Sequence, residues 1–452
     1  MTVEGLRNEF EERQINKVKL IGFDIDGVGR GKYVSLEKLL SVVEGGFGFC
    51  DVVFGWDIND ELYDRPGFTG ADSGYPDLLA RVDLDTLRFI PWEPGAALFV
   101  IDFHQVDGQP LPVGPRQVLR RVLERARAMG FTVRASVEYE YFIFDETPQT
   151  LRAKGFRGLT PLTPGMFGYS VLRASSQAEL VHAIFDGMAA YGVPLEGLHT
   201  ETGPGVYETA IKHDEALAAA DKAALFKTGV KEIAARRGKT ATFMAKWNPA
   251  LPGCSGHLHL SLWDEGGANA FYAAGEPDAA SRTARQFIAG QVALMPDLCV
   301  LVCPTINSYK RLVPGAWAPT TASWGVENRT AAVRWVPGSV KSSRVEYRLA
   351  PADANPYLAL AAALASGLWG IERGLEPDEP YPGNVYNAPP GRFAPLPVSL
   401  EEATARMLES APARELLGEA FVSHFAATRD WECRQFRAAV TDWELTRYFE
   451  SI

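Results

Sequence analysis

The sequence has few cysteines and no long uninterrupted apolar segment. Its 452 residues include five cysteines, scattered along the chain as Cys50, Cys254, Cys299, Cys303 and Cys433. One pair falls at helical spacing, but no second pair completes a zinc site, so reduced structural thiols are expected. The longest apolar stretch, residues 357–369, is too short and too rich in Gly and Ala to span a bilayer. The polar N-terminus carries no apolar signal region. We therefore expect a cytoplasmic protein without a membrane segment.

Basic residues are outnumbered, and a phosphate-binding P-loop is absent. Lys plus Arg total 45 against 56 for Asp plus Glu, which gives a net charge of −11. This balance argues against a nucleic-acid binder or a protein that binds anionic membranes, although it permits a local basic pocket for a phosphate. The pattern G-x-x-x-x-G-K-[ST] does not occur, so the chain is not a P-loop protein.

The first part of the chain predicts a small, mostly β domain over residues 1–105. Residues 17–34 alternate like a strand, a turn and a second strand. An apolar run over 51–58 precedes a polar loop, residues 59–74. Further strand-like pieces cover residues 87–91 and 97–103.

The pattern changes from residue 114 onward and predicts an α+β domain over residues 106–452. Residues 116–129 have the periodicity of an amphipathic helix. Segments that favour strands then alternate with segments that favour helices, so we expect a sheet backed by helices. The expected strands are 133–144 and 257–263, and the expected helices are 178–191, 215–235 and 284–294.

Two pairs of glutamates stand out in these segments. In V-E-Y-E-Y, residues 137–141, strand alternation puts Glu138 and Glu140 on one face and the apolar side chains on the other. Like charges side by side are costly to bury unless a cation offsets them, so this face is either solvated or a cation site. A second pair, Glu201 and Glu208, brackets a Gly-Pro-Gly turn that lets both ends converge on one point.

Two more strands place polar side chains on one face. The string C-S-G-H-L-H-L-S-L-W, residues 254–263, aligns His257, His259 and Ser261. The string V-K-S-S-R-V-E-Y-R, residues 340–348, aligns Arg344, Glu346 and Arg348. Together with the glutamate pairs, these strands offer five glutamates and one histidine, a donor set suited to Mg²⁺ or Mn²⁺. Two ions bridged by phosphate oxygens balance five carboxylates better than one.

Arginines gather in the same region. Their guanidinium groups fit carboxylates and phosphates, and the residues between them are apolar or aromatic, which disfavours a merely solvated basic stretch. They are Arg311, Arg329, Arg334, Arg344 and Arg348. The residues alone therefore predict a two-metal, phosphate-handling enzyme with an anionic co-substrate.

Several strings resemble the glutamine synthetase family almost from end to end. N-S-Y-K-R-L-V-P-G-x-x-A-P runs from Asn307 to Pro319, and E-N-R-T-A-A-V-R runs from Glu327 to Arg334. G-K-T-A-T-F-M-A-K ends at Lys246, and R-V-E-Y-R-x-x-P-A-D-A-N-P-Y-L starts at Arg344. The resemblance implies an N-terminal β-grasp domain and a catalytic domain with a curved antiparallel sheet. It also implies two stacked rings of subunits, a dodecamer, with sites between neighbouring N- and C-terminal domains.

The resemblance also implies a role for each matching residue. Glu140, Glu201 and Glu208 resemble the ligands of one metal, and Glu138, His257 and Glu346 those of the other. ATP would contact His259, Ser261, Arg334, Lys341 and Arg344, with Arg334 and Arg344 near the transferred phosphoryl group. Glutamate would be held by Arg311, Arg329, Arg348 and the backbone around Gly253. The implied chemistry is phosphorylation of the γ-carboxylate by ATP and attack by an amine on the acyl phosphate.

Two departures from the family pattern concern the amine. Family members that use ammonia carry a proton-accepting glutamate in the loop after K-R-L-V-P-G, where this chain has Trp317. Their ammonium-site motif is also replaced here by F-G-W-D-I-N, which contains Trp56 and Asp57. Deprotonating an alkylammonium of pKa near 10.4 at pH 7 costs roughly 4–5 kcal/mol, and a base in the site helps to supply that. An aromatic amine needs no such base, and an indole offers it an apolar surface.

We therefore expect an ATP- and Mg²⁺-dependent ligase that joins L-glutamate to an organic amine, with a bulky or aromatic amine favoured. The first alternative is a glutamine synthetase that uses ammonia, with Asp57 or another carboxylate as base. The second is a non-catalytic relative, which is disfavoured because every metal position carries a competent ligand. Tyr386 falls where some bacterial relatives carry an adenylylated tyrosine, but its flanking residues match only in part. We expect it to lie in an unmodified surface loop.

Overall fold

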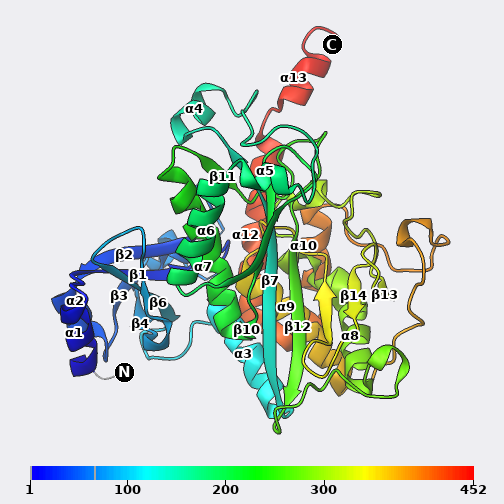
Figure 1. The fold of residues 1–452 in the computed structure, drawn as a ribbon, viewed down its shortest axis with the longest axis horizontal. Helices are drawn as coiled ribbons and strands as arrows, with labels where there is room; N and C mark the ends of the chain where they lie inside the picture. Colours follow the sequence, from blue (N-terminus) through cyan, green and yellow to red (C-terminus); the bar gives the residue numbers. More distant parts are fainter. Residues whose placement is uncertain (1–2, 66–67) are drawn as a thin grey trace.

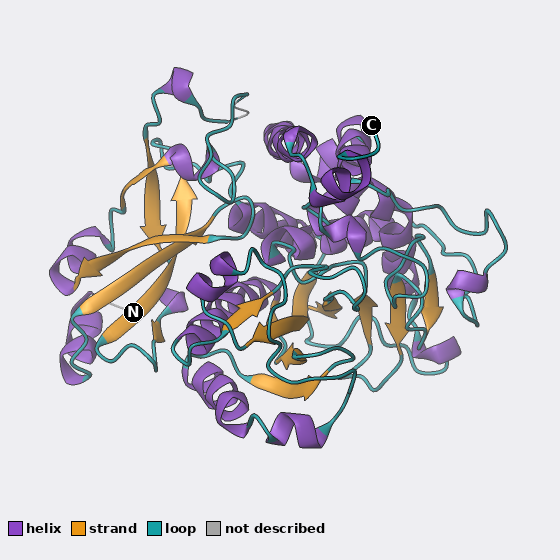
Figure 2. Cartoon of the chain, turned by 90° about the horizontal axis from the view of Figure 1, so that it is seen from above, coloured by secondary structure: helices purple, strands orange, loops and turns teal. Residues whose placement is uncertain are grey.

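Two β-sheets organise the chain in the computed structural model, which describes residues 3–65 and 68–452. The N-terminal sheet has six strands in the order β2-β1-β6-β4-β3, with β5 paired to β6. It lies to one side of the rest of the molecule (Figure 1, Figure 2). Its elements are α1 (Val3–Glu12), β1 (Lys17–Phe23), β2 (Gly29–Ser35), α2 (Leu36–Val42), β3 (Phe47–Cys50), β4 (Asp77–Val82), β5 (Arg88–Phe89) and β6 (Ala96–His104).

The predicted strand, turn and strand over 17–34 are confirmed as the antiparallel pair β1 and β2. The first half of the apolar run over 51–58 forms a short 3₁₀ helix, Asp51–Phe54. Residues 66–67 of the predicted loop 59–74 lie outside the described residues. The β-grasp name and the domain boundary at residue 105, which falls after β6, stay predictions.

The second sheet has nine strands in the order β13-β14-β15-β12-β7-β9-β8, and β10 and β11 also pair with β7. Its long central strands, β7 and β12, run side by side through the molecule (Figure 1). The predicted antiparallel pairing holds except for β13, which runs parallel to β14. The strands are β7 (Phe131–Phe144), β8 (Leu195–Thr200), β9 (Val206–Ile211), β10 (Asp214–Glu215), β11 (Thr240–Thr242), β12 (Gly256–Asp264), β13 (Trp324–Val326), β14 (Val333–Val336) and β15 (Arg344–Tyr347).

Helices cover one face of this sheet, which confirms the predicted α+β class (Figure 2). Most predicted helices lie within two residues of their expected bounds, but α8 continues through Pro296, well past the expected end at residue 294. The helices of this part are α3 (Pro115–Ala128), α4 (Pro148–Ala153), α5 (Val171–Ser175), α6 (Ala178–Ala190), α7 (Ala216–Ala235), α8 (Arg282–Val302), α9 (Pro356–Glu372), α10 (Leu400–Glu409), α11 (Ala411–Leu417), α12 (Glu419–Ala438) and α13 (Asp442–Tyr448).

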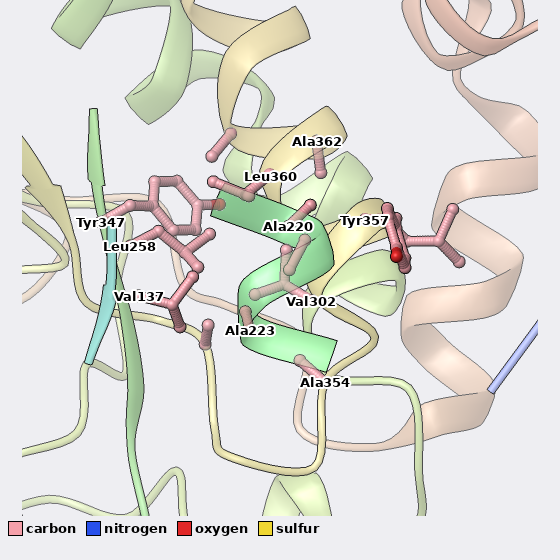
Figure 3. Packing of buried hydrophobic residues seen from close by; sticks show 14 of the residues in the cluster. Val137, Ala220, Ala223, Leu258, Val302, Tyr347, Ala354, Tyr357, Leu360 and Ala362 are labelled. Carbon is pink, nitrogen blue, oxygen red and sulfur yellow. The ribbon is translucent and has the colours of Figure 1, made fainter. Parts of the chain in front are cut away.

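The apolar face of the second sheet packs against α7, α8 and α9. Figure 3 shows Val137 of β7, Leu258 of β12 and Tyr347 of β15 facing apolar residues of these helices, among them Ala220, Ala223, Val302 and Leu360. The helices approach closely because they carry Ala and Gly where they meet. A Cβ at Gly290 of α8 would lie 2.1 Å from the Ser366 carbonyl oxygen of α9. This close contact holds α8 and α9 together in the helical layer against which the sheet packs.

Helix α8 is long and apolar enough, by length and composition, to cross a membrane. However, 78% of its most apolar window is buried inside the protein. Burial between the sheet and neighbouring helices accounts for its apolar composition.

A buried arginine joins the two sheets. Arg116 of α3 contacts Asp102 of β6 at 2.6 Å and Asp83 at 2.8 Å, and both acids belong to the N-terminal part. Its Nε also donates to Asp221 of α7 at 2.8 Å, and the Tyr357 hydroxyl donates to the same carboxylate at 2.7 Å. The charges of all three acids thus meet one guanidinium group between the two parts of the chain.

Candidate active site

The strand register brings the predicted metal ligands to one place. On β7, Tyr139 and Tyr141 are buried in an aromatic cluster, so Glu138 and Glu140 point to the opposite face. Across the sheet, Glu208 of β9 lies opposite Glu140, and His257 of β12 lies opposite Glu138. The alternation expected from the sequence is therefore realised on neighbouring strands.

The first predicted metal group contains a histidine that sequence reasoning missed. His199 Nε2 lies 3.1 Å from Glu208 Oε1, and His199 Nδ1 lies 3.7 Å from Glu201 Oε1. The donor atoms of these three side chains all lie within 4.8 Å of one another. Tyr169 stacks on the imidazole at 4.3 Å. His199 stands two residues before Glu201 in an extended segment, a spacing that puts both on one strand face and that was available in the sequence.

Burial and mutual repulsion disfavour the ionised form of the carboxylates in this group. The pKa of Glu208 is raised to about 11 by burial, by its hydrogen bond with Glu138 and by the neighbouring carboxylates. Burial also raises the pKa of Glu140, although Arg311 opposes the shift. The Glu140 carboxylate accepts the Ser255 backbone N–H, which orients it. A divalent cation here would offset the repulsion, so these residues fit a Mg²⁺ or Mn²⁺ ion.

The second predicted group is built around a neutral histidine. Burial, with Arg348 nearby, lowers the pKa of His257 to about 3, and an unprotonated imidazole is the form that binds metals. Its Nδ1 lies 3.3 Å from Glu346 Oε1. Its Nε2 is buried and finds no hydrogen-bond partner among residues 3–65 and 68–452. Despite burial, the surrounding histidines and arginines lower the pKa of Glu346 to about 2. An ionised carboxylate beside a free imidazole nitrogen again suits a metal ion.

Four of the five predicted ATP residues border a cavity of about 310 Å³. His259 of this set accepts from Arg344 Nε at 3.2 Å and contacts Glu138 at 3.1 Å, which ties the cavity to the metal groups. Arg334 does not line the cavity but pairs with Glu346 at 2.9 Å and with Glu327. Sequence reasoning found four of the lining residues, His259, Ser261, Lys341 and Arg344, and missed Arg134, Glu196, His213 and Trp263.

Arg134 and Trp263 form one wall of this cavity. The Arg134 guanidinium lies 4.9 Å from the indole ring centroid, in a cation–π arrangement. The indole N–H donates to the Ser261 hydroxyl at 3.0 Å. A flat, charged and aromatic wall of this kind suits a nucleotide base.

The predicted glutamate site contains a buried cation and a tightly packed backbone. Arg311 is 3% exposed and donates to the Leu349 carbonyl at 3.1 Å. A Cβ at Gly253 would lie 2.5 Å from the Ala245 carbonyl oxygen, so only glycine fits there. Arg348 pairs with Glu346 and thereby connects this site to the second metal group. Arg329, the remaining predicted glutamate-binding arginine, is exposed.

In residues 3–65 and 68–452, Trp317 shares no hydrogen bond or ring contact with the other residues predicted to form an amine pocket. Trp317 is 65% exposed, and no described contact joins it to Trp56 or Asp57. Trp56 lies under the Arg30 guanidinium at 5.0 Å. The Asp57 carboxylate accepts two backbone N–H groups of its own loop and the Trp431 indole N–H at 3.0 Å. Inside a single subunit, Asp57 therefore shapes a loop.

Tyr386 lies in a largely exposed segment, as expected, within a short 3₁₀ helix, Val385–Asn387. It is half-buried, and its hydroxyl donates to the Ala318 carbonyl at 2.8 Å, next to Trp317. Nothing in the sequence indicated the 3₁₀ turn, or that this segment reaches the residues around Trp317.

Comparison with known proteins identifies the family of the chain. The family model described as "Glutamine synthetase, catalytic domain" matches residues 112–448. The chain is 47% identical to type-1 glutamine synthetase 2 of Dictyostelium discoideum, over 96% of this chain and 84% of that protein. It is 40% identical to glutamate–isopropylamine ligase of a Pseudomonas species, over 99% of this chain and 98% of that protein. It is also 41% identical to gamma-glutamylethanolamide synthetase GlnA4 of Streptomyces coelicolor, over 99% and 96%.

The fold is shared as well. A solved structure described as a GmaS/ADP complex superimposes with a TM-score of 0.86 at 29% identity, covering 98% of this chain and 99% of that one. With the family model matching most of the chain, and ligases of organic amines among its full-length relatives, the chain belongs to the glutamine synthetase family, close to the γ-glutamyl-amide ligases.

Proposed function

We propose that this protein, an ATP-dependent carbon–nitrogen ligase by family, joins the γ-carboxylate of L-glutamate to an organic amine. The observation that carries the choice of amine is Trp317. An exposed indole stands in the loop where ammonia-using members place a proton-accepting glutamate. The relatives named for isopropylamine and ethanolamide support the same class of product.

The reaction has two steps in this proposal. A γ-carboxylate oxygen of glutamate attacks the γ-phosphorus of ATP, and ADP leaves. The amine nitrogen then attacks the acyl carbon, the phosphate leaves with the bonding electrons, and the nitrogen loses one proton. Both steps build charge that fixed cations neutralise.

The chain's own side chains would divide the work as follows. Arg344 borders the nucleotide cavity, and Arg334 lies at Glu346, so both would neutralise the phosphoryl oxygens. Arg311, Arg329 and Arg348 would hold the glutamate carboxylates. Two Mg²⁺ or Mn²⁺ ions would supply charge neutralisation at the phosphate oxygens. Glu140, Glu201 and Glu208 would hold one of them, with His199 beside it, and Glu138, His257 and Glu346 would hold the other.

For the amine, we propose a bulky or aromatic substrate such as aniline or isopropylamine. An indole that buries an apolar substituent contributes about 25 cal/mol for each Å² removed from water, whereas it cannot accept a proton from ammonium. The site would be completed by a neighbouring subunit in a ring, because no hydrogen bond or ring contact in the described part of the chain links Trp317 to Trp56 or Asp57. We propose a dodecamer for this ring assembly.

The test measures phosphate release with ATP, Mg²⁺ and L-glutamate over a panel of amines, with products identified by mass. The panel is ammonium, methylamine, ethanolamine, putrescine, isopropylamine and aniline. We expect an organic amine to give the highest kcat/KM, and we expect Trp317→Glu to shift preference toward ammonium while Trp317→Phe keeps the original order. Ammonium as the best substrate of the wild-type enzyme would overturn the proposal.

One competing function has specific support. The relative from Dictyostelium discoideum is named a glutamine synthetase, which favours ammonia as the amine. The same panel decides between the two functions, because a glutamine synthetase would give its highest kcat/KM with ammonium.

A further inference from the structure

One loop contacts two separate segments of the candidate active site. We call residues 313–319, which include Trp317, the flap loop, and residues 381–387 the latch loop. The Tyr386 hydroxyl of the latch loop donates to the Ala318 carbonyl of the flap loop at 2.8 Å. Burial raises the pKa of Tyr386, while Arg311 and Arg348 act in the opposite sense, which places the ring near the predicted glutamate site.

The other end of the latch loop is fixed to the segment that carries Arg329. The Asn328 amide donates to the Tyr381 carbonyl at 3.0 Å and to the Gly383 carbonyl at 2.8 Å. The Thr330 hydroxyl accepts the Val385 backbone N–H at 3.0 Å. Arg329 lies between these two anchors. The latch loop is therefore bonded on both sides of a predicted glutamate-binding residue.

The flap loop needs an external restraint. Trp317 adopts φ 57°, a left-handed conformation that costs a bulky residue about 1–3 kcal/mol and persists only where neighbours enforce it. Its own side chain is mostly exposed, but the next residue, Ala318, is fully buried. Within the described ranges 3–65 and 68–452, Tyr386 is the only side chain that hydrogen-bonds to the flap loop. The restraint on Trp317 thus runs through Tyr386.

We infer that Tyr386 is a positioning residue that holds the flap loop in the conformation presenting Trp317 to the amine. The role rests on the proposed function, because it assigns Trp317 to the amine pocket. Tyr386 itself touches the Ala318 carbonyl and takes no part in the chemistry. The latch loop couples this placement to Arg329, so the flap loop and the glutamate-binding segment share one support.

Tyr386→Phe tests the inference, because it removes only the hydroxyl and keeps the ring packing. A lost hydrogen bond of about 1 kcal/mol corresponds to roughly a fivefold change. We expect amide hydrogen exchange over residues 313–318, followed by mass spectrometry, to accelerate about fivefold. We expect the KM for the preferred amine to rise by a similar factor, while the KM for ATP changes less than twofold. Tyr381→Phe is the matched control. Tyr381 belongs to the same latch loop and its ring packs on Phe393 at 5.5 Å, but within the described ranges its hydroxyl makes no hydrogen bond to the flap loop.

A second variant shows whether the effect passes through Trp317. In a Trp317→Ala background, Tyr386→Phe should accelerate flap exchange but add no further increase in the amine KM. Unchanged exchange in Tyr386→Phe overturns the inference, and so does faster exchange with an unchanged amine KM. Hydrogen exchange is measured on the free protein, so it reports on the latch even if the wild-type enzyme forms no γ-glutamyl amide, an outcome that would refute only the proposed function.

Discussion

Replacing Arg116 by methionine should weaken the junction between the two sheets more than any other single charge removal described here. The guanidinium is buried, with a side-chain exposure of 6%, and so is its Asp221 partner at 4%. Without Arg116, Asp83 and Asp102 still contact Arg120 at 2.8 and 2.9 Å. Among the residues that the structure describes, Asp221 then keeps only the Tyr357 hydroxyl as a hydrogen-bond partner. The cost therefore falls on one uncompensated buried carboxylate, about 3–5 kcal/mol in the free energy of unfolding.

The assay is urea unfolding followed by circular dichroism, with Arg120→Met as the control. Arg120 is 34% exposed and shares both of its partners with Arg116, so its loss should cost no more than about 1 kcal/mol. Adding Asp221→Asn to Arg116→Met should recover at least about 2 kcal/mol, because the orphaned charge is gone. Equal midpoints for the two arginine variants, or no recovery in the double variant, would refute this account of the junction.

Three further results are expected. Removing divalent cations with EDTA should lower Tm and stop phosphate release, and Mg²⁺ at a hundred times its Kd should restore about 2.7 kcal/mol of folding stability. The Tm of Glu208→Gln should respond less to Mg²⁺. An unchanged Tm of the wild type in EDTA would contradict a resident ion. Burial beside Arg429 lowers the pKa of His424 to about 4, so the unfolded state gains a proton first as pH falls. The free energy of unfolding should then drop by up to about 3 kcal/mol between pH 6.5 and 4. The drop should be smaller in His424→Phe and as large as in the wild type in the exposed control His182→Asn. Parallel pH profiles of Tm for wild type and His424→Phe would argue against this role of His424. Arg134→Ala should raise the KM for ATP about three- to tenfold with the amine KM unchanged, since Arg134 lines the nucleotide cavity over Trp263; an unaltered ATP KM would remove Arg134 from the nucleotide site.

Strand alternation made much of the site predictable. Glu138 and Glu140 share a face because side chains alternate along a strand, and the large rings of Tyr139 and Tyr141 mark the other face as the buried one. Both statements hold for any register of the sheet. The sequence could not show which strands lie beside β7. That information depends on the pairings of Glu138 with His257 and of Glu140 with Glu208, which only the folded sheet supplies.

Other features escaped because they depend on contacts between distant loops. Arg134 lies on the polar face of β7 with no local signal that Trp263 stacks beneath it. The Tyr386 loop reads as polar and turn-rich, and nothing in it indicates a bond to a residue 68 positions away. Asp57 looked like a displaced active-site acid, yet within one chain its oxygens accept N–H groups of its own loop and of Trp431.

Strand β7 carries the glutamates of the site on one side and the tyrosines of the core on the other. Tyr141 meets Phe243 at 5.0 Å, and Tyr139 meets the same ring at 5.7 Å, so the strand's position is set by how these rings fill space. Shrinking one ring would let the backbone shift and carry two carboxylates with it. A survey of all single substitutions scored by formation of the amide product would therefore rank these tyrosines with the residues of the reaction centre, although neither one faces a substrate.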